Sequence, residues 1–98
     1  MDKLTNRQRK YLKSRAHHLK PVVTIGGMGL TDAVVDEQEN SIAHHELLKI
    51  KLPAGEKGER ESLLQAACSA VKASPVTLIG RTGVIFRAAQ ESSFQLPD

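Results

Sequence analysis

With 98 residues and a net charge of +3, the chain is long enough for one small domain and too short for a multidomain enzyme. Apolar residues make up 40% of it and aromatic residues only 3%, so its core has to be aliphatic. A single cysteine, Cys68, excludes an internal disulfide and a multi-cysteine metal site. Neither a membrane-spanning apolar run nor a secretory signal is visible in the sequence, so we expect a reduced, cytoplasmic compartment.

Positive charge is concentrated at the start of the chain. Residues 1–30 carry seven lysines and arginines against one acidic residue, Asp2, whereas the rest of the chain has a net charge of −3. Such asymmetry indicates a polyanionic partner. A solvated helix face would explain it as well, so charge alone does not decide.

The first predicted helix runs from Thr5, a suitable N-cap, to about Ala16, and Pro21 prevents it from continuing. At about 100° per residue its apolar face consists of Leu4, Tyr11, Leu12 and Ala16. The opposite face is basic and consists of Arg7, Arg9, Lys10 and Lys13. Arg15 intrudes on the apolar side, where its head is expected at the edge of the core.

A short strand follows over Val22–Ile25, because these residues are mostly β-branched and lie between Pro and Gly. After a loop with three glycines, Thr31 or Asp32 caps a second helix that runs to about Ala43. Its thin apolar side consists of Leu30, Val34, Val35 and Ile42. Its outer side is acidic and consists of Asp36, Glu37 and Glu39.

The segment LLKIKL, residues 47–52, alternates as a strand does. Leu48, Ile50 and Leu52 face one way, and Lys49 and Lys51 face the other. These lysines either extend the basic surface or keep one sheet face solvated, and the sequence favours the second interpretation.

The last part of the chain predicts one more helix and a hairpin. A loop, PAGEKGE, precedes a third helix from roughly Arg60 to Ala73. The apolar face of this helix is expected to consist of Leu63, Leu64, Ala67, Ala70 and Val71. Two strands, PVTLIG and GVIFRA, are joined by the GRTG turn, and the polar tail from Gln90 offers Phe94 and Leu96 for docking.

The resulting order, α-β-α-β-α-β-β, predicts an α/β fold. Strands separated by helices favour parallel, right-handed crossovers, and the final hairpin is antiparallel. We therefore expect a four-stranded mixed sheet with helices packed on it.

The glycine-rich loop does not match the nucleotide-binding fingerprints. A Walker A loop needs a lysine after its last glycine, and a Rossmann loop would need a third glycine where Asp32 stands. What remains is G-x-x-G, Gly26 to Gly29, before a helix N-terminus, where free amides and the helix dipole favour phosphate. Because Asp32 partly cancels that potential, the loop should depend on the basic first helix and on Lys20. A plain connecting turn is the alternative.

Two other kinds of site are not expected. Adjacent histidines, His17-His18 and His44-His45, point about 100° apart on a helix, and no Cys/His cluster accompanies them, so we predict no metal. Cys68 is interpreted as a buried thiol rather than a nucleophile.

Three segments in this order closely resemble the YhbY-like, single-domain bacterial members of the CRM family, named for chloroplast RNA splicing and ribosome maturation. The segments are LTNRQRKYLKSRAHHLKPVVTIGGMGLTDAV (4–34), HHELLKIKL (44–52) and VTLIGRTGVIFR (76–87). The resemblance implies a fold similar to the C-terminal domain of translation initiation factor three. It also implies one RNA-binding domain over residues 1–98, with a core of about 4–90 and a polar tail at 91–98.

The resemblance further implies binding of RNA in precursors of the large ribosomal subunit, and we expect a non-enzymatic monomer without a cofactor. The residues expected to contact RNA are Arg7, Arg9, Lys10, Lys13, Lys20, Gly26, Gly27, Met28, Gly29, Arg81 and Arg87, with Gly27 the dispensable glycine. Two positions depart from the family pattern: Phe86, where an aromatic residue with a hydroxyl is common, and Gly83, where a branched apolar residue is frequent.

Two other functions fit parts of the sequence. The acidic second helix would suit a module that docks basic ribosomal proteins or assembly factors. A small phosphate-ligand enzyme could use the glycine loop, although the sequence offers neither a general base nor a phosphate-binding lysine for it.

Overall fold

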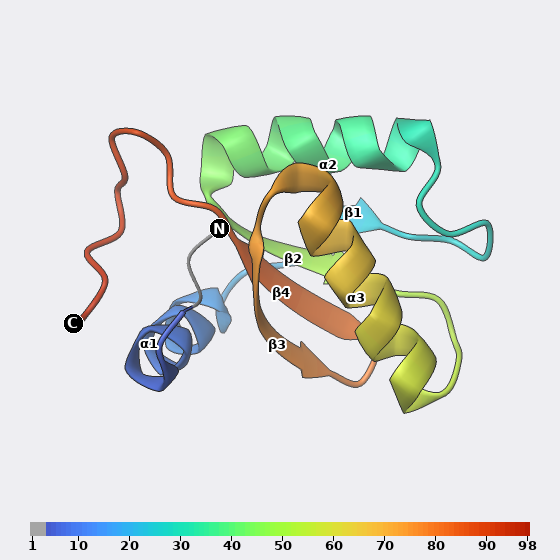
Figure 1. The fold of residues 1–98 in the computed structure, drawn as a ribbon, viewed down its shortest axis with the longest axis horizontal. Coiled ribbons are helices and arrows are strands. Elements are labelled where there is room, and N and C mark those ends of the chain that lie inside the picture. The colour runs from blue at the N-terminus through green and yellow to red at the C-terminus, as the bar shows by residue number, and fades with distance from the viewer. Residues whose placement is uncertain (1–3) are drawn as a thin grey trace.

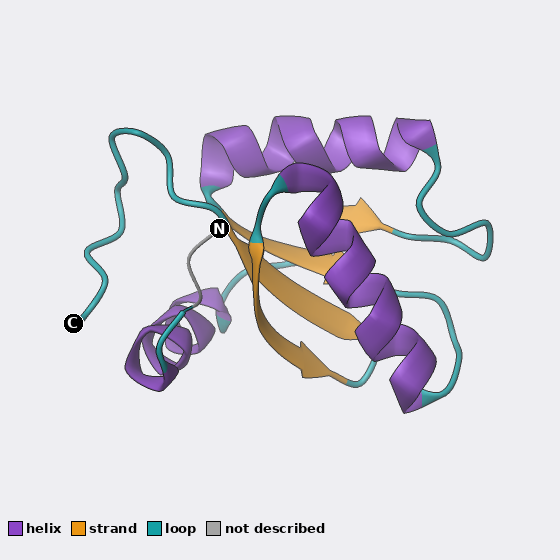
Figure 2. Ribbon diagram, viewed as in Figure 1, coloured by secondary structure: helices purple, strands orange, loops and turns teal. Residues whose placement is uncertain are grey.

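The computed structural model describes residues 4–98, and Figure 2 shows its helices and strands. In chain order these are α1 (Asn6–Ala16), β1 (Val23–Thr24), α2 (Asp32–His45), β2 (Leu47–Lys51), α3 (Lys57–Val71), β3 (Ser74–Ile79) and β4 (Thr82–Phe86). The predicted order is confirmed. Within residues 4–98, none of the helices has the length and apolar character needed to cross a bilayer.

The four strands form one mixed sheet in the order β1-β2-β4-β3. β1 is parallel to β2, whereas β4 is antiparallel to both β2 and β3. Helices α2 and α3 cover one face of the sheet, and α1 lies against the other (Figure 1). The predicted architecture is therefore confirmed, with the helices divided between the two faces.

The face under α2 and α3 holds the larger core. Its buried members are Val23, Ile25, Ile42, Leu48, Ile50, Leu52, Leu64, Ala67, Cys68, Val71, Ala73 and Ile85. Gln38 is buried between the two helices, where its side-chain amide donates to the carbonyl of Ala67 at 2.7 Å. Gly83 faces the same core, and a Cβ there would stand 2.6 Å from Leu64 Cδ1, so the departure from the family pattern makes room for Leu64.

The face under α1 holds a smaller core. Its buried members are Leu12, Ala16, Leu47, Val76, Val84 and Phe86. Phe94 and Leu96 from the tail pack against it, as predicted, and Phe94 meets Phe86 edge to face with 5.5 Å between ring centres. Leu47 belongs to this core, so β2 has apolar residues on both faces rather than on one.

The ends of the first two helices follow from their caps. Thr5 and Gln8 form a reciprocal capping box, because each backbone amide donates to the other's side chain, at 3.0 and 3.1 Å. Thr31 caps α2 through a 3.2 Å hydrogen bond from the amide of Val34. The prediction that α2 ends near Ala43 was too short, because Glu46, with a φ of 63°, ends the helix only after His45.

The third helix was predicted wrongly at both ends. It begins at Lys57 rather than Arg60, because Glu59 accepts from the amide of Glu56 and closes the first turn earlier. It ends at Val71, since Lys72 takes the left-handed conformation with a φ of 55°. Its apolar face lacks Ala70, which is exposed, whereas the prediction that Cys68 is a buried thiol is confirmed.

Glu46 holds the C-terminal tail against the rest of the domain through hydrogen bonds. The residue is buried, and its carboxylate accepts hydrogen bonds from the amides of Ala89 and Ser93, at 2.8 and 3.0 Å. Burial alone would raise its pKa, but hydrogen bonds from Ser92, Ala89 and Ser93 outweigh that effect and hold the pKa at about 2. The tail is thereby placed beside the α1 core.

Candidate nucleic-acid interface

The G-x-x-G loop leaves the sheet at the end of β1. The amide of Ile25 donates to the carbonyl of Lys51 at 2.8 Å, and the amide of Gly29 closes a turn onto the carbonyl of Gly26 at 3.0 Å. Gly29 has a φ of 76°, a conformation that side chains other than glycine, asparagine and aspartate rarely adopt. Gly26 and Gly27 have no such requirement and point into open space. The fold therefore needs a residue at 29 that tolerates a positive φ, and glycine at 26 and 27 leaves the backbone accessible.

The loop is well exposed and leads directly into α2. Met28 at its tip is 89% exposed. Thr31 satisfies the amide of Val34, and Asp32 is exposed in the first turn of the helix. An anion that approaches the loop meets the helix N-terminus together with this carboxylate, so binding there requires cations from elsewhere.

The basic residues of α1 lie away from the sheet, as the sequence predicted. Arg7, Lys10 and Lys13 are exposed, whereas Arg9 is half-buried and donates to Asn6 at 3.3 Å. The helix carries no acidic residue in its first turn.

The helix does not stand beside the glycine loop, which corrects our expectation that it supplies the loop's positive charge. Along the longest axis of the molecule, α1 lies at one end and the loop at the other (Figure 1). The amphipathic pattern of α1 identifies its basic face, but only the sheet topology shows where that face lies. The cations nearest the loop must come from the strands.

Strand pairing places Lys51 at the loop end of the sheet. Thr24, Lys51 and Thr82 are neighbours across β1, β2 and β4, and their side chains share the face on which α1 packs. Lys51 and Thr24 are exposed and Thr82 is half-buried, so α1 does not cover this row. Ile79, paired with Thr82, continues the row and is 60% exposed.

Arg81 lies at the same end, in the turn between β3 and β4. Its Nε donates to the carbonyl of Leu52 at 3.1 Å, and its own carbonyl accepts from the amide of Leu52. These bonds hold the turn of the hairpin against the end of β2. Arg81 and Lys51 therefore lie at the end of the sheet where the glycine loop begins.

Lys20 lies in the segment that connects α1 to β1. It is exposed and follows α1, and Val22, two residues later, is hydrogen-bonded through its amide to the carbonyl of Lys49. The Lys49 ammonium donates a hydrogen bond to the carbonyl of Leu19 at 3.0 Å. Lys49 lies on the same face of the sheet as Lys51, but its side chain is already hydrogen-bonded within the chain.

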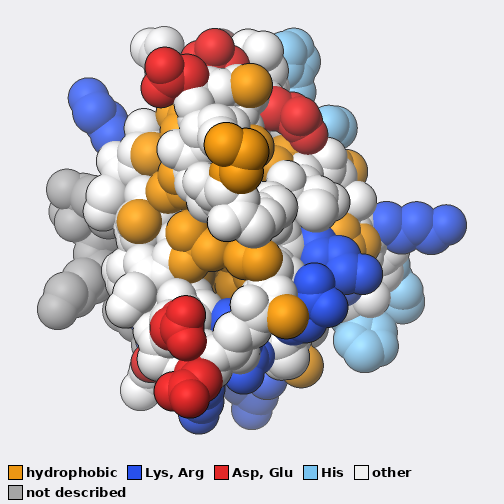
Figure 3. Space-filling view, turned by 90° about the vertical axis from the view of Figure 1, so that its right-hand side faces the viewer, with side chains coloured by type: hydrophobic (Ala, Val, Ile, Leu, Met, Phe, Trp, Pro, Cys, Tyr) orange, Lys and Arg blue, Asp and Glu red, His pale blue; other side chains and the backbone are white. Residues whose placement is uncertain are grey.

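Charge is divided between the two sides of the sheet. Helix α1 and the four strands contain no aspartate or glutamate, whereas α2 and α3 contain Asp32, Asp36, Glu37, Glu39, Glu59 and Glu61. Figure 3 looks at the loop end and shows most Lys and Arg side chains gathered along its right and lower parts, with acidic side chains at the top and lower left. We call the uncovered surface formed by α1, Lys20, Lys51, Arg81 and the glycine loop the basic face.

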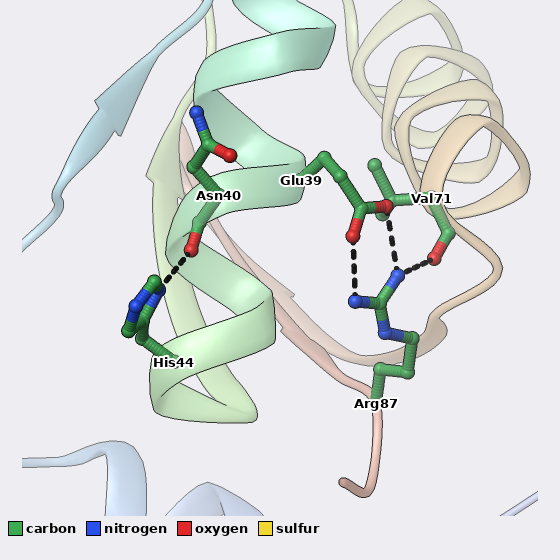
Figure 4. A network of polar contacts seen from close by, with 5 residues as sticks. All are labelled: Glu39, Asn40, His44, Val71 and Arg87. Carbon is green, nitrogen blue, oxygen red and sulfur yellow. Dashed lines mark hydrogen bonds and ion pairs between the residues drawn. The ribbon is translucent and has the colours of Figure 1, made fainter.

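Arg87 is held within the chain. Its guanidinium makes two hydrogen bonds to the Glu39 carboxylate, at 2.7 and 2.8 Å, and a third to the carbonyl of Val71 at 2.8 Å (Figure 4). The hydrogen bond to Arg87 lowers the pKa of Glu39, and the same bond raises the pKa of Arg87. This pair joins α2, the end of α3 and the end of β4, and it lies apart from the basic face.

The structure offers no support for catalysis by the residues considered above. Cys68 is buried, and burial raises the pKa of its thiol to about 12, so it is not a ready thiolate. In the part of the chain from Leu4 to Asp98, no three His, Cys, Asp or Glu side chains are grouped as metal ligands would be. His44 instead binds the carbonyl of Asn40 at 2.7 Å (Figure 4).

The model of the CRS1/YhbY (CRM) domain family matches residues 4–87. The chain belongs to the CRM family. Within it, an RNA-binding protein of Haemophilus influenzae is 40% identical over 97 residues, which cover 99% of this chain and 98% of that protein. A probable RNA-binding protein of Pseudomonas aeruginosa is 39% identical over 84 residues, or 86% and 81% of the two chains.

The fold is confirmed by a solved structure. The solution structure of a hypothetical Staphylococcus aureus protein, described as a candidate for RNA binding, has a TM-score of 0.86 with this chain. The two are 26% identical, and the match covers 96% of this chain and 99% of the other. The names of these relatives refer to RNA binding and not to an enzymatic activity, which agrees with the prediction that the chain is not an enzyme.

Proposed function

We propose that this CRM protein binds RNA through the basic face. The proposal rests on the separation of charge between the elements: α1 and the four strands have lysines and arginines but no aspartate or glutamate, whereas α2 and α3 have six acidic residues. Lysine and arginine side chains on one surface are the electrostatic footprint of a nucleic-acid partner. The family relatives with RNA-binding names support the same assignment.

In this proposal the two ends of the basic face make different contacts with the RNA. Arg7, Lys10 and Lys13 on α1 attract and position the phosphate backbone from one end. At the other end, Gly26 and Gly29 let a phosphate approach the backbone and the start of α2, with Met28 at the tip. Lys51 and Arg81 supply the positive charge that the loop itself lacks. Since Arg87 is engaged by Glu39, we assign it to the fold rather than to RNA.

The partner we propose is ribosomal RNA in precursors of the large subunit, bound by a cytoplasmic monomer that acts in assembly. With 3% aromatic residues, the protein should read the shape and backbone of a structured RNA more than its sequence. Asp36 and Glu37 are exposed on the other side of the sheet, so a basic ribosomal protein could dock there while RNA occupies the basic face.

The glycine loop provides the test. Gly29→Asp places a carboxylate where the phosphate should approach, and aspartate tolerates a positive φ better than most residues. We expect affinity for a large-subunit rRNA fragment to fall at least tenfold while the domain stays folded by circular dichroism. Gly29→Asn is the matched control, because it has the same size without the charge. Equal affinities of the Asp variant and the wild-type protein would contradict the proposal.

A further inference from the structure

A cavity of about 300 Å³ opens at the C-terminal end of α1. Its walls are apolar and come from four parts of the chain: Leu19 after α1, Val22 before β1, Leu47 on β2 and Phe94 in the tail. Leu19 and Val22 are 38% and 52% exposed, and both line this one cavity. The cavity therefore presents apolar surface that the fold has not covered.

The rim of the cavity is basic. Arg15, Lys20, His45 and Lys49 line it, and among residues 4–98 no aspartate or glutamate does. Glu46, next in sequence, directs its carboxylate to the amides of Ala89 and Ser93 instead. Apolar walls under a positive rim suit a ligand that has a flat, weakly polar part joined to an anionic group.

An aromatic ring and a guanidinium meet at this rim. The guanidinium carbon of Arg15 lies 6.0 Å from the centre of the Phe94 ring, and Phe94 is braced edge to face by Phe86. Aromatic rings and arginine planes are the groups on which proteins stack unpaired bases. Phe94 is half-buried, so part of its surface is free to serve this purpose.

We infer that this cavity receives one unpaired nucleotide of the bound RNA. Its base enters between Leu19, Val22 and Phe94, and its phosphate meets Arg15 and Lys20. The volume is at the lower end of the range of roughly 300–1,000 Å³ for small-molecule sites, which suits a single base. The inference rests on the proposed function, because Lys20 joins the cavity to the basic face. An unpaired nucleotide is also the one that costs least to turn out of a helix.

The first test compares two RNA hairpins that differ only in one bulged nucleotide in the stem. The wild-type protein should bind the bulged hairpin more tightly. Phe94→Ala should weaken binding of the bulged hairpin at least fivefold, since stacking on one aromatic ring contributes about 1–3 kcal/mol, and should change binding of the paired hairpin little. Leu96→Ala is the control, because Leu96 also packs from the tail on the α1 core but does not line the cavity.

A second measurement uses the wild-type protein, so that release of the tail cannot be confused with loss of a contact. Methyl resonances of Leu19 and Val22 should shift with the bulged hairpin and not with the paired one. Equal affinity for both hairpins with unshifted methyls would overturn the cavity assignment and leave the proposed function standing. Shifts caused by an apolar peptide but by neither bound hairpin would also overturn it. Failure to bind either hairpin would overturn both proposals.

Discussion

The two faces of the sheet differ in how completely they are covered. Under α2 and α3, apolar residues of three strands are sealed from water, and the cation at the end of β4, Arg87, is paired with Glu39. Under α1, the core stops at Val84, and the next row of the sheet, which includes Thr24 and Lys51, is open. We therefore assign stability mainly to one face of this small sheet and binding to the other.

The sealed face should show the largest effect on stability. Ile50→Ala would remove a fully buried side chain from the larger core and leave a cavity, so we expect the free energy of unfolding to fall by about 2–5 kcal/mol. Urea denaturation measures this loss. The RNA affinity of the protein that remains folded should not change. A loss of RNA binding at unchanged stability would contradict the assignment of stability and binding to opposite faces.

A substitution of Glu46 measures how much its hydrogen bonds to the tail stabilise the domain. Glu46→Gln should lower the free energy of unfolding at neutral pH by roughly 1–3 kcal/mol, because it replaces a buried carboxylate that accepts several hydrogen bonds. The pKa of Glu46 in the folded state, about 2, lies below its ordinary value of 4.5. Its stabilisation is therefore full above pH 4.5 and is lost as the pH falls toward 2. Denaturation across this range should show the two proteins converging; a constant difference would contradict the account.

Lys51 tests the open face directly. Lys51→Glu should weaken RNA binding about tenfold and make the slope of log affinity against log salt shallower by about one phosphate contact. Unfolding should change little, because the side chain is exposed. Lys57→Glu on α3 is the matched control, since Lys57 is also exposed and lies on the other side. Equal losses for the two variants would show a general effect of net charge.

Arg87 should give the smallest effect and the opposite pattern. Arg87→Gln removes the ion pair with Glu39 and the bond to Val71, and we expect a loss of about 1 kcal/mol in stability, because Glu39 is half exposed and solvent screens the pair. RNA affinity should stay within about twofold of the wild-type value, a difference of roughly 0.4 kcal/mol. A tenfold loss of affinity would instead show that Arg87 contacts RNA, as the family resemblance implies.

The sequence predicts the fold well because its signals are local. Thr5 and Thr31 cap the helices as expected, and the alternation in LLKIKL identifies β2. The error at the start of α3 arose where Glu59 accepts from the amide of Glu56 and closes a helical turn inside PAGEKGE, the segment predicted as a loop. Local pattern could not show that α1 lies far from the glycine loop, because the sheet order sets that distance.

The site was predicted less completely for the same reason. From the sequence, Lys51 cannot be told apart from the other lysine of its strand, and only its pairing with Thr24 shows that it lies beside the loop. Arg87 was predicted to contact RNA, and only the structure shows that it is paired with Glu39. Arg15 was expected at the edge of the core, and only the docked tail shows that it meets Phe94 there. Each case depends on contacts between residues far apart in the chain.

Amide chemical shifts recorded during titration with a large-subunit rRNA fragment show directly which face binds RNA. We expect the shifts to concentrate on α1, on Lys20, on the row of Thr24 and Lys51, and on Gly26 to Gly29, while the solvent side of α2 and α3 stays unchanged. Shifts concentrated on α2 and α3, with the basic face silent, would contradict that expectation.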